Sequence, residues 1–241
     1  MHRFFLPPED FHVDHIQIRG KTARQIARVL RMKAGEECVL LDDMGSEYLA
    51  RLDVVDVDGC SAEIVERHRA EEPEVQLLMM LCLTQREKFE WMLQKCTEVG
   101  AAGFLPVISQ RSLVQDEADV RNKVERWEGI LREAAEQSGR GMIPRLHQVL
   151  RFDAAVEEVE HEYPLRLIPW EGEKLAGLKS VLLGDVSKRV AVLIGPEGGF
   201  AEEEVKGAVN RGFQPVTLGR RILRTETAAV VSAALVLHEL E

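Results

Sequence analysis

The stretch from Val190 to Phe200, VAVLIGPEGGF, decides the fold of the larger part of this chain. Its first five residues are apolar and predict a buried strand, which ends in a glycine-rich loop that leads into a predicted helix. In open α/β sheets, ligands bind beyond the carboxyl ends of such strands, and glycines there let the backbone approach a bound molecule. An ordinary strand-to-helix turn is the alternative interpretation. The loop has neither the Gly-x-Gly-x-x-Gly dinucleotide pattern nor the Gly-Lys-Ser/Thr of a P-loop, which disfavours a nicotinamide-dependent or nucleotide-hydrolysing enzyme.

From Val75 onward, predicted strands alternate with predicted helices, which is typical of a mostly parallel sheet covered on both faces. We expect strands at residues 75–83, 104–108, 165–168, 190–194 and 215–218. We expect helices at residues 86–99, 120–138, 202–210 and 225–240. The expected fold class of this region is therefore α/β.

Residues 1–70 show a different pattern, in which short alternations of apolar and polar residues predict the strands of a small β-barrel. The expected strands are residues 2–6, 15–18, 38–41, 48–52 and 62–65, with one helix at residues 22–30. The acidic segment 69–74 contains Pro73 and suits neither a strand nor a buried helix, so it is interpreted as a linker. The expected domains are residues 1–70 and 74–241.

Composition places the chain of 241 residues, 45% hydrophobic and 30% charged, among soluble globular proteins. Its longest apolar runs fall short of the roughly 20 residues of a membrane span, and its N-terminus opens no signal peptide, so we expect a cytoplasmic protein without a membrane partner. The four cysteines are at least 14 positions apart and the histidines show no ligand spacing with them. This spacing predicts reduced thiols and no metal site.

Charge is distributed unevenly along the chain. The net charge is 31 − 41 = −10, which by itself disfavours a nucleic-acid partner because phosphates would be repelled. Residues 1–34, however, carry seven basic and three acidic side chains, and residues 205–225 carry five basic side chains and no acidic one. Each cluster is compatible with a solvated surface and with contact to an anionic partner.

The loop before the last predicted helix carries Arg224 directly ahead of Thr225 and Glu226. Thr225 is expected to cap the helix, with Glu226 in its first turn. A cation at this end of a helix opposes the helix dipole by about 0.3–1 kcal/mol. The placement of Arg224 therefore favours a function toward an anion or an electron-rich substrate over simple surface charge.

Two blocks carry a resemblance to a known family: LIGPEGGF from Leu193 to Phe200, and LGRRILRTETA from Leu218 to Ala228. Together with the segments 2–5, 94–100, 106–112 and 133–140, they resemble the ribosomal RNA small subunit methyltransferase E family, which belongs to the SPOUT class of knotted methyltransferases. The resemblance implies a PUA-like N-terminal barrel followed by a C-terminal α/β domain with a trefoil knot. It also implies a homodimer that uses S-adenosylmethionine to methylate N3 of a uridine in the decoding region of 16S rRNA, within the small ribosomal subunit.

The family pattern further implies which residues form the site. Three loops would converge on S-adenosylmethionine, with cofactor-binding residues Ile168, Pro169, Trp170, Glu171, Gly195, Pro196, Glu197, Gly198, Gly199, Leu218, Gly219, Arg221, Ile222, Leu223 and Thr227. RNA-binding positions are expected at Arg3, Arg24, Arg28, Arg111 and Arg140.

The catalytic candidates lie in the same loops. Arg224 would stabilise the charge that develops on the uracil carbonyls. Glu197 and Glu226 are candidate proton acceptors, although hydrogen bonding within the loop and favourable charge in the first helical turn explain their presence equally well.

One position departs from the family pattern. Ala201 replaces the usual Ser or Thr N-cap after the glycine-rich motif, which predicts a loss of about 1 kcal/mol of local stability. Two alternatives remain for the function: a related SPOUT enzyme that methylates ribose 2′-hydroxyl groups, or a non-catalytic RNA-binding assembly factor.

Overall fold

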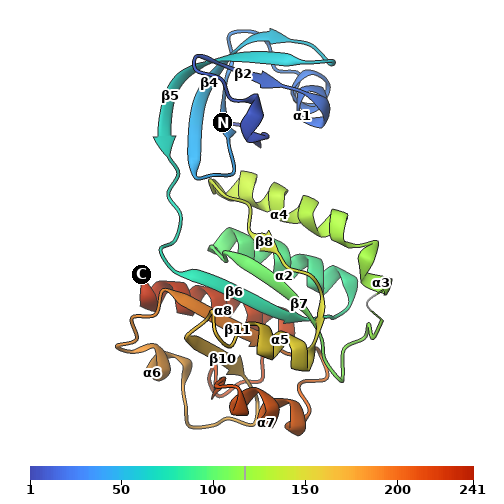
Figure 1. Cartoon of the computed structure of the whole chain (residues 1–241), viewed down its shortest axis with the longest axis vertical. Coiled ribbons are helices and arrows are strands. Elements are labelled where there is room, and N and C mark those ends of the chain that lie inside the picture. The colour runs from blue at the N-terminus through green and yellow to red at the C-terminus, as the bar shows by residue number, and fades with distance from the viewer. Residues whose placement is uncertain (117) are drawn as a thin grey trace. The chain divides into compact units, whose positions relative to one another are not determined.

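Two separate sheets, one in each of two units, organise the structure, a computed structural model that describes residues 1–116 and 118–241 (Figure 1). The first unit contains Met1–Glu72 and Ala135–Ile143, and the second contains Pro73–Ala134 and Pro144–Glu241. The first unit is thus built from two stretches that lie far apart in the sequence.

The first unit has a five-stranded sheet in the order β1-β3-β4-β5-β2. Its strands are β1 (Arg3–Phe5), β2 (His15–Ile18), β3 (Glu37–Leu41), β4 (Ser46–Val55) and β5 (Cys60–Arg69), with the short 3-10 helix η1 (Pro8–Asp10) between the first two. β1 pairs parallel with β3, and the other neighbours pair antiparallel. Alternate side chains such as Leu40, Ala50 and Leu52 form the buried core of this unit. Each expected strand is present, and β4 and β5 are longer than expected.

The helix expected at residues 22–30 is present in an altered form. It begins as α1 (Gly20–Arg24) and continues as the π-helix η2 (Gln25–Leu30). It ends where Arg31 adopts a left-handed conformation with a φ of 54°. The Arg24 and Arg28 side chains are exposed on this helix. π-Helical turns are rare in proteins, and those that do occur often lie at functional sites. This basic helix is therefore a candidate for a binding role.

The second unit has a parallel sheet in the order β12-β10-β11-β6-β7-β8, and β9 also pairs with β7. Its strands are β6 (Gln76–Cys82), β7 (Gly103–Ile108), β8 (Arg145–Leu146), β9 (Leu150–Arg151), β10 (Leu165–Pro169), β11 (Arg189–Ile194) and β12 (Gln214–Val216). The five longer ones match the expected strands. The α/β fold class is therefore confirmed.

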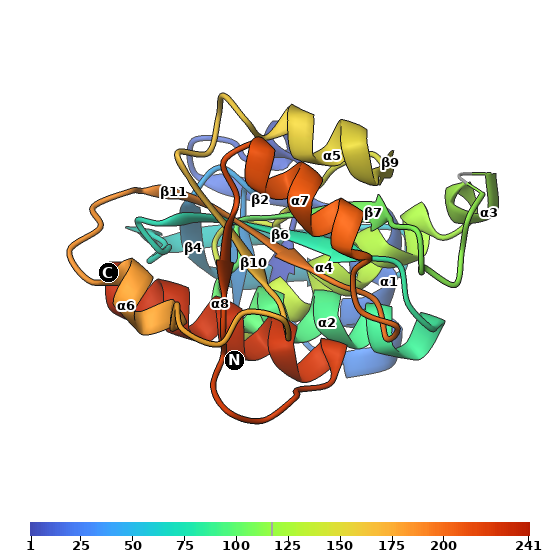
Figure 2. The same ribbon diagram turned by 90° about the horizontal axis from the view of Figure 1, so that it is seen from below.

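Helices cover both faces of this sheet (Figure 2). One face carries α2 (Arg86–Val99), α6 (Leu178–Leu182) and α8 (Thr225–Leu240), and the other carries α5 (Phe152–Glu158) and α7 (Glu202–Asn210). The helix expected at residues 120–138 is divided into α3 (Ala118–Arg121) and α4 (Val124–Ser138). Trp127 of α4 packs against Phe89 of α2, with ring centroids 4.5 Å apart.

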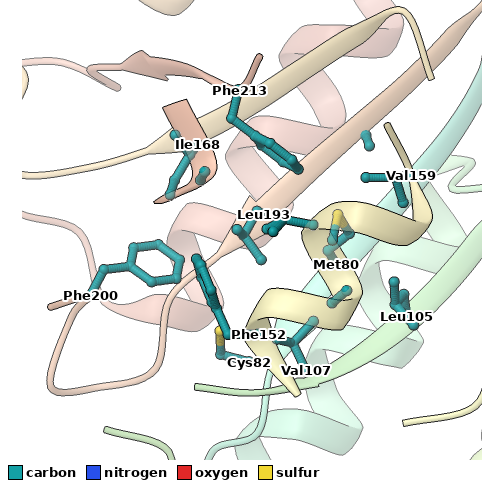
Figure 3. Packing of buried hydrophobic residues seen from close by; sticks show 14 of the residues in the cluster. Met80, Cys82, Leu105, Val107, Phe152, Val159, Ile168, Leu193, Phe200 and Phe213 are labelled. Carbon is teal, nitrogen blue, oxygen red and sulfur yellow. The ribbon is translucent and has the colours of Figure 1, made fainter. Parts of the chain in front are cut away.

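A buried apolar cluster between the sheet, α5 and α7 anchors the glycine-rich loop after β11 (Figure 3). Met80 and Cys82, which are alternate residues of β6, contribute their side chains to this cluster. Phe200, at the end of the loop, packs edge-on against Phe152, with ring centroids 6.0 Å apart and an interplanar angle of 66°. Because Phe200 is only 4% exposed, the carboxyl end of the loop is fixed to the core.

The segment expected to be a linker has a structural role in the first unit. β5 extends to Arg69. The carboxylate of Glu72 accepts a hydrogen bond from Nη2 of Arg140 at 2.7 Å, and from the N–H groups of Gly141 and Met142 at 2.7 and 3.1 Å. These bonds attach the segment Ala135–Ile143 to Glu72, three residues after the end of β5. Contiguous domains of residues 1–70 and 74–241 do not include this association.

Glu72→Ala should lower the free energy of unfolding by about 2–4 kcal/mol, because the charge of Arg140 and two backbone N–H groups lose their acceptor. The Arg140 side chain is 9% exposed, so water replaces that acceptor poorly. Urea denaturation measures the difference. Glu71→Ala is the matched control, since Glu71 is exposed and its loss should change stability by less than about 0.5 kcal/mol. Equal stability of the two variants would contradict this role.

Candidate functional site

Two adjoining cavities lie at the carboxyl ends of β10, β11 and β12. These strands run parallel, so the loops that follow them emerge at the same edge of the sheet. The larger cavity has a volume of about 410 Å³ and the smaller about 100 Å³. They share the lining residues Pro169, Glu171, Ile222, Leu223 and Ala228. The larger volume lies within the range of roughly 300–1,000 Å³ that is typical of small-molecule sites.

The structure brings most of the expected site residues together around these cavities. The lining includes Pro169, Trp170, Glu171, Gly195, Pro196, Glu197, Gly198, Gly199, Leu218, Gly219, Arg221, Ile222, Leu223, Arg224 and Glu226. Two expected cofactor-binding residues lie elsewhere. The Ile168 side chain is fully buried in the apolar cluster (Figure 3), and Thr227 is exposed and lines neither cavity.

Several lining residues were not expected from the sequence. Lys88, Phe200, Thr225 and Ala228 line the larger cavity, and Lys174, Thr217 and Arg220 line the smaller one. Lys88 comes from the first turn of α2, which follows β6, and β6 is the neighbour of β11 in the sheet. The order of the strands would have identified Lys88, but that order is not visible in the sequence.

The glycine-rich loop requires glycine at two positions. Gly199 has a φ of +67°, and a Cβ placed on it would lie 2.7 Å from Oε1 of Glu171. A Cβ on Gly195 would lie 3.0 Å from the ring of Phe200. A Cβ on Gly198 would instead lie 3.4 Å from Cβ of Arg111. The loop therefore follows a path that larger residues do not allow.

Helix α7 begins directly after this loop with half of a capping box. Ala201 occupies the N-cap and, being alanine, has no side-chain oxygen to offer the helix. Oε2 of Glu204 accepts a hydrogen bond from the Ala201 N–H at 2.9 Å. One of the two reciprocal capping bonds is thus retained.

Glu197 is held by basic and backbone donors. Its Oε1 accepts hydrogen bonds from Nζ of Lys88 at 3.2 Å and from the N–H of Gln85 at 3.3 Å. Burial raises the pKa of this carboxyl, but the hydrogen bonds from its own N–H, from Gln85 and from Lys88 outweigh burial and hold the pKa below its ordinary value. Glu197 is therefore ionised at neutral pH and is a weak proton acceptor, which disfavours the catalytic role expected for it.

Arg224 stands at the start of α8 as its N-cap residue, with φ −67° and ψ 154°. Thr225 is the first residue of the helix, so the prediction that Thr225 caps it is wrong. The Arg224 side chain is exposed and lines the larger cavity. None of the residues that the structure describes forms a hydrogen bond or ion pair with its guanidinium, so this cation is available to a ligand.

Glu226 supplies a buried acceptor in the same cavity. Its Oε2 is buried and has no hydrogen-bond partner among the described residues. An unsatisfied buried acceptor costs about 1–3 kcal/mol, a cost that a ligand donor would remove. The larger cavity therefore offers a free cation, Arg224, and an unpaired carboxylate oxygen, on Glu226 two positions further along the chain.

Three of the five expected RNA-binding arginines are engaged within the protein. Arg3 donates to Glu47 at 2.7 Å and to the carbonyl of Gly139 at 3.1 Å. Arg140 is buried against Glu72, and Arg111 donates to the carbonyl of Gly198 at 2.8 Å. These partners disfavour RNA contact by Arg3 and Arg140, whereas Arg24 and Arg28 are exposed.

The cysteine thiols are poor candidates for covalent catalysis. All four cysteines are buried and free, and burial raises the pKa of Cys38 and of Cys96 to about 12, which makes both poor nucleophiles. Residues 1–116 and 118–241 contain no group of three or more His, Cys, Asp or Glu side chains placed to hold a metal ion. Within the same residues, no helix is long and apolar enough to cross a membrane.

Comparison with known proteins identifies both units. A family model described as an RNA methyltransferase domain matches residues 70–237, and one described as an RNA methyltransferase PUA domain matches residues 18–65. The ribosomal RNA small subunit methyltransferase E of Synechocystis sp. is 32% identical over 240 residues, which cover 97% of this chain and 76% of that protein. The Bacillus subtilis protein of the same name is 30% identical, with coverage of 100% and 98%.

Solved structures agree with these matches. A ribosomal RNA small subunit methyltransferase E from Neisseria gonorrhoeae, bound to S-adenosylmethionine, superposes with a TM-score of 0.86 at 31% identity over 97% of this chain and 95% of that one. A putative methyltransferase from Legionella pneumophila, also in complex with S-adenosylmethionine, gives a TM-score of 0.82 at 29% identity over 98% and 96%. The resemblance inferred from the sequence motifs is confirmed, and so is the PUA-like N-terminal domain. The chain belongs to the ribosomal RNA small subunit methyltransferase E family.

Proposed function

We propose that this protein methylates N3 of a uridine in the decoding region of 16S rRNA, in the small ribosomal subunit, with S-adenosylmethionine as cofactor. The observation that carries the proposal is the free Arg224 guanidinium at a cavity of about 410 Å³ between the glycine-rich loop and the loop before α8. Membership of the family supplies the reaction class, and the cavity supplies the chemical groups that the reaction needs.

The cavity residues fit the cofactor. The backbone of residues 195–199 and 218–223 would hold S-adenosylmethionine, because glycines there leave the peptide groups accessible. The relatives from Neisseria gonorrhoeae and Legionella pneumophila bind the same molecule. When bound, S-adenosylmethionine supplies an electrophilic methyl group.

Arg224 would stabilise the substrate during transfer. The N3 proton of uracil lies between two carbonyl groups, and its loss spreads negative charge onto both oxygens. A fixed cation beside them lowers the free energy of that charged state more than that of the neutral base. The exposed and unpaired guanidinium of Arg224 at the larger cavity supports this role.

Glu226 is the better candidate to accept the N3 proton. Its Oε2 is buried without a partner at the cavity, whereas Glu197 is bound to Lys88 and has a lowered pKa. An oxygen that receives no hydrogen bond has its lone pairs free for a proton, whereas Oε1 of Glu197 already accepts from Lys88 and Gln85. The cavity walls contribute by holding base and methyl group in line.

The proposal is tested on small ribosomal subunits from cells that lack this protein. These subunits are incubated with the purified protein and S-adenosylmethionine, and the methylated nucleoside is identified by mass spectrometry of the digested 16S rRNA. We expect 3-methyluridine at one position of the decoding region. A 2′-O-methylated nucleoside would instead indicate the related enzyme class, and cofactor binding without methyl transfer would indicate a non-catalytic assembly factor.

We also propose that the basic helix of the first unit contacts the RNA backbone, and that the protein is a homodimer. Arg24 and Arg28 are exposed on α1 and η2. Helix α8 is apolar on nearly all sides, yet Val230, Val231 and Leu235 are only half-buried and Ala234 is exposed. A second copy packed on α8 would cover these side chains.

Arg224→Ala should keep the affinity for S-adenosylmethionine within a few-fold but slow single-turnover methylation by roughly 10² to 10³, the range for loss of one charge-stabilising donor. Rapid-quench measurement at saturating cofactor and ribosomal subunits gives this rate. Arg224→Lys should recover only part of it, because the ammonium lacks the two-donor fork of the guanidinium. Normal methylation by Arg224→Ala would remove this residue from the mechanism.

Reversal of charge at Arg24 and Arg28, to Glu at both, should weaken RNA binding and reduce the slope of log affinity against log salt by roughly 0.7 or more per lost phosphate contact. Titrations at several salt concentrations measure both quantities. The matched control is the same double reversal at Arg121 and Lys123, which lie in the second unit. The affinity for S-adenosylmethionine should be unchanged in both double variants. Equal loss of RNA affinity in the two double variants would show that only the net charge of the protein matters.

Sedimentation velocity at micromolar concentration should show a dimer. Ala234→Glu should shift the protein toward monomer, because the change places a charge on the apolar face of α8 that a partner would bury. A wild-type monomer under these conditions would contradict the proposed homodimer.

A further inference from the structure

The loop after β7 is hydrogen-bonded to the glycine-rich loop after β11. Nη1 of Arg111 donates to the carbonyl of Gly198 at 2.8 Å. In the same peptide unit, the N–H of Gly199 donates to the carbonyl of Pro196 at 2.9 Å. The peptide between Gly198 and Gly199 is therefore held at both of its polar atoms, which fixes the orientation of its plane.

A second connection between the two loops involves Ala201, three residues after Gly198. Oε1 of Glu204 accepts from the N–H of Gln110 at 2.7 Å, and Oε2 of the same side chain accepts from the N–H of Ala201 at 2.9 Å. Glu204 thus joins the residue before Arg111 to the end of the glycine-rich loop. The two loops are held together on both sides of Phe200.

The loop that carries Arg111 is held by hydrogen bonds within itself. The N–H of Ser109 donates to Oγ of Ser112 at 3.0 Å, and the two hydroxyl groups are 2.9 Å apart in a buried position. Nε2 of Gln115 donates to the carbonyls of Ser112 and Ser109 at 2.7 and 3.0 Å. Arg111 therefore extends from a turn that these hydrogen bonds hold in place. Its guanidinium, in turn, constrains the carbonyl of Gly198 through the hydrogen bond between them.

Two adjacent glycines make such support necessary. Gly198 and Gly199 have more conformational freedom than other residues, and a ligand that needs one loop conformation must offset the entropy of ordering the rest. A loop that is already ordered binds with less loss. The aliphatic part of Arg111 also occupies the space in front of Gly198, at 3.4 to 3.5 Å from the position of a Cβ.

We propose that Arg111 is a positioning residue of the methyl-donor site, which holds the Gly198–Gly199 peptide in the conformation that binds S-adenosylmethionine. This inference rests on the proposed function, and it replaces the RNA contact expected for Arg111 from the sequence. Glu204, whose charge is opposite to that of Arg111, helps to hold the same two loops together through its bonds to Gln110 and Ala201.

The opposite charges of Arg111 and Glu204 make the test specific. Affinity for S-adenosylmethionine is measured by calorimetry without RNA for the wild type, Arg111→Ala, Arg111→Lys and Glu204→Gln. The control is Arg121→Ala, which removes the same charge from an exposed position of α3. We expect Arg111→Ala to weaken cofactor binding about tenfold, the loss of one hydrogen bond from a charged donor.

The other variants have distinct expected results. Glu204→Gln should weaken cofactor binding several-fold, because an amide keeps only one of the two acceptors. Arg111→Lys should restore part of the affinity, and Arg121→Ala should bind like the wild type. In steady-state assays, Arg111→Ala should raise KM for S-adenosylmethionine while kcat at saturating cofactor stays within a few-fold. Melting profiles should match the wild type, since Arg111 is exposed.

The inference is overturned if Arg111→Ala binds S-adenosylmethionine like the wild type and loses only RNA affinity, which would make Arg111 an RNA contact. It is also overturned if Glu204→Gln leaves cofactor binding unchanged while Arg111→Ala and Arg121→Ala weaken it equally, which would make the effect one of net charge. A wild-type protein that does not bind the cofactor would overturn the proposed function itself, a result distinct from either of these.

Discussion

The parallel pairing of β10 with β11 and β12 is the constraint on which the site depends. Strands that run in one direction deliver their following loops to one edge, so segments separated by more than 50 residues meet there. The central strands are buried on both faces, and Phe200 fastens the glycine-rich loop to the same core. The core and the cavity are thus parts of one packing arrangement, in which the apolar cluster sets the shape of the loop that would bind the ligand.

Some charged groups that line the larger cavity are paired with each other, and others are unpaired. Lys88 and Glu197 satisfy each other, while Arg224 and Oε2 of Glu226 have no partner among the described residues. A protein that optimised only its own stability would leave neither an unpaired cation at a helix N-terminus nor a buried carboxylate oxygen without a donor in the same cavity. The unpaired groups are therefore the ones that indicate chemistry, and the paired ones maintain the geometry around them.

Three long helices of the second unit were predicted well because they contain enough residues for periodicity to be visible, whereas β4 and β5 extend beyond their expected bounds. The bounds of α2, α7 and α8 agree with expectation to the residue, whereas β8 and β9, with two residues each, carry no pattern. The motif positions were found, but the direction of individual side chains was not, and the side chains of Ile168 and Thr227 line neither cavity. Lys88 depends on a strand order that only the fold defines, and the internal partners of Arg3 and Arg140 cannot be inferred from counts of charge. Periodicity also gives no indication of a trefoil knot, which was expected from the family resemblance alone.

The assignment of Ala135–Ile143 to the first unit limits how this protein can be divided or rearranged. The chain passes from one unit to the other three times, so neither unit is a continuous fragment. A fragment that ended at residue 72 would leave the Glu72 carboxylate without its donors and the N–H of Phe5 without the Glu136 oxygen that accepts from it at 3.0 Å. The first unit is therefore not a self-contained segment that can be transferred by itself. Exchange of this unit between relatives must carry residues 135–143 along with it, and recombination breakpoints that preserve function should avoid the boundary near residue 72.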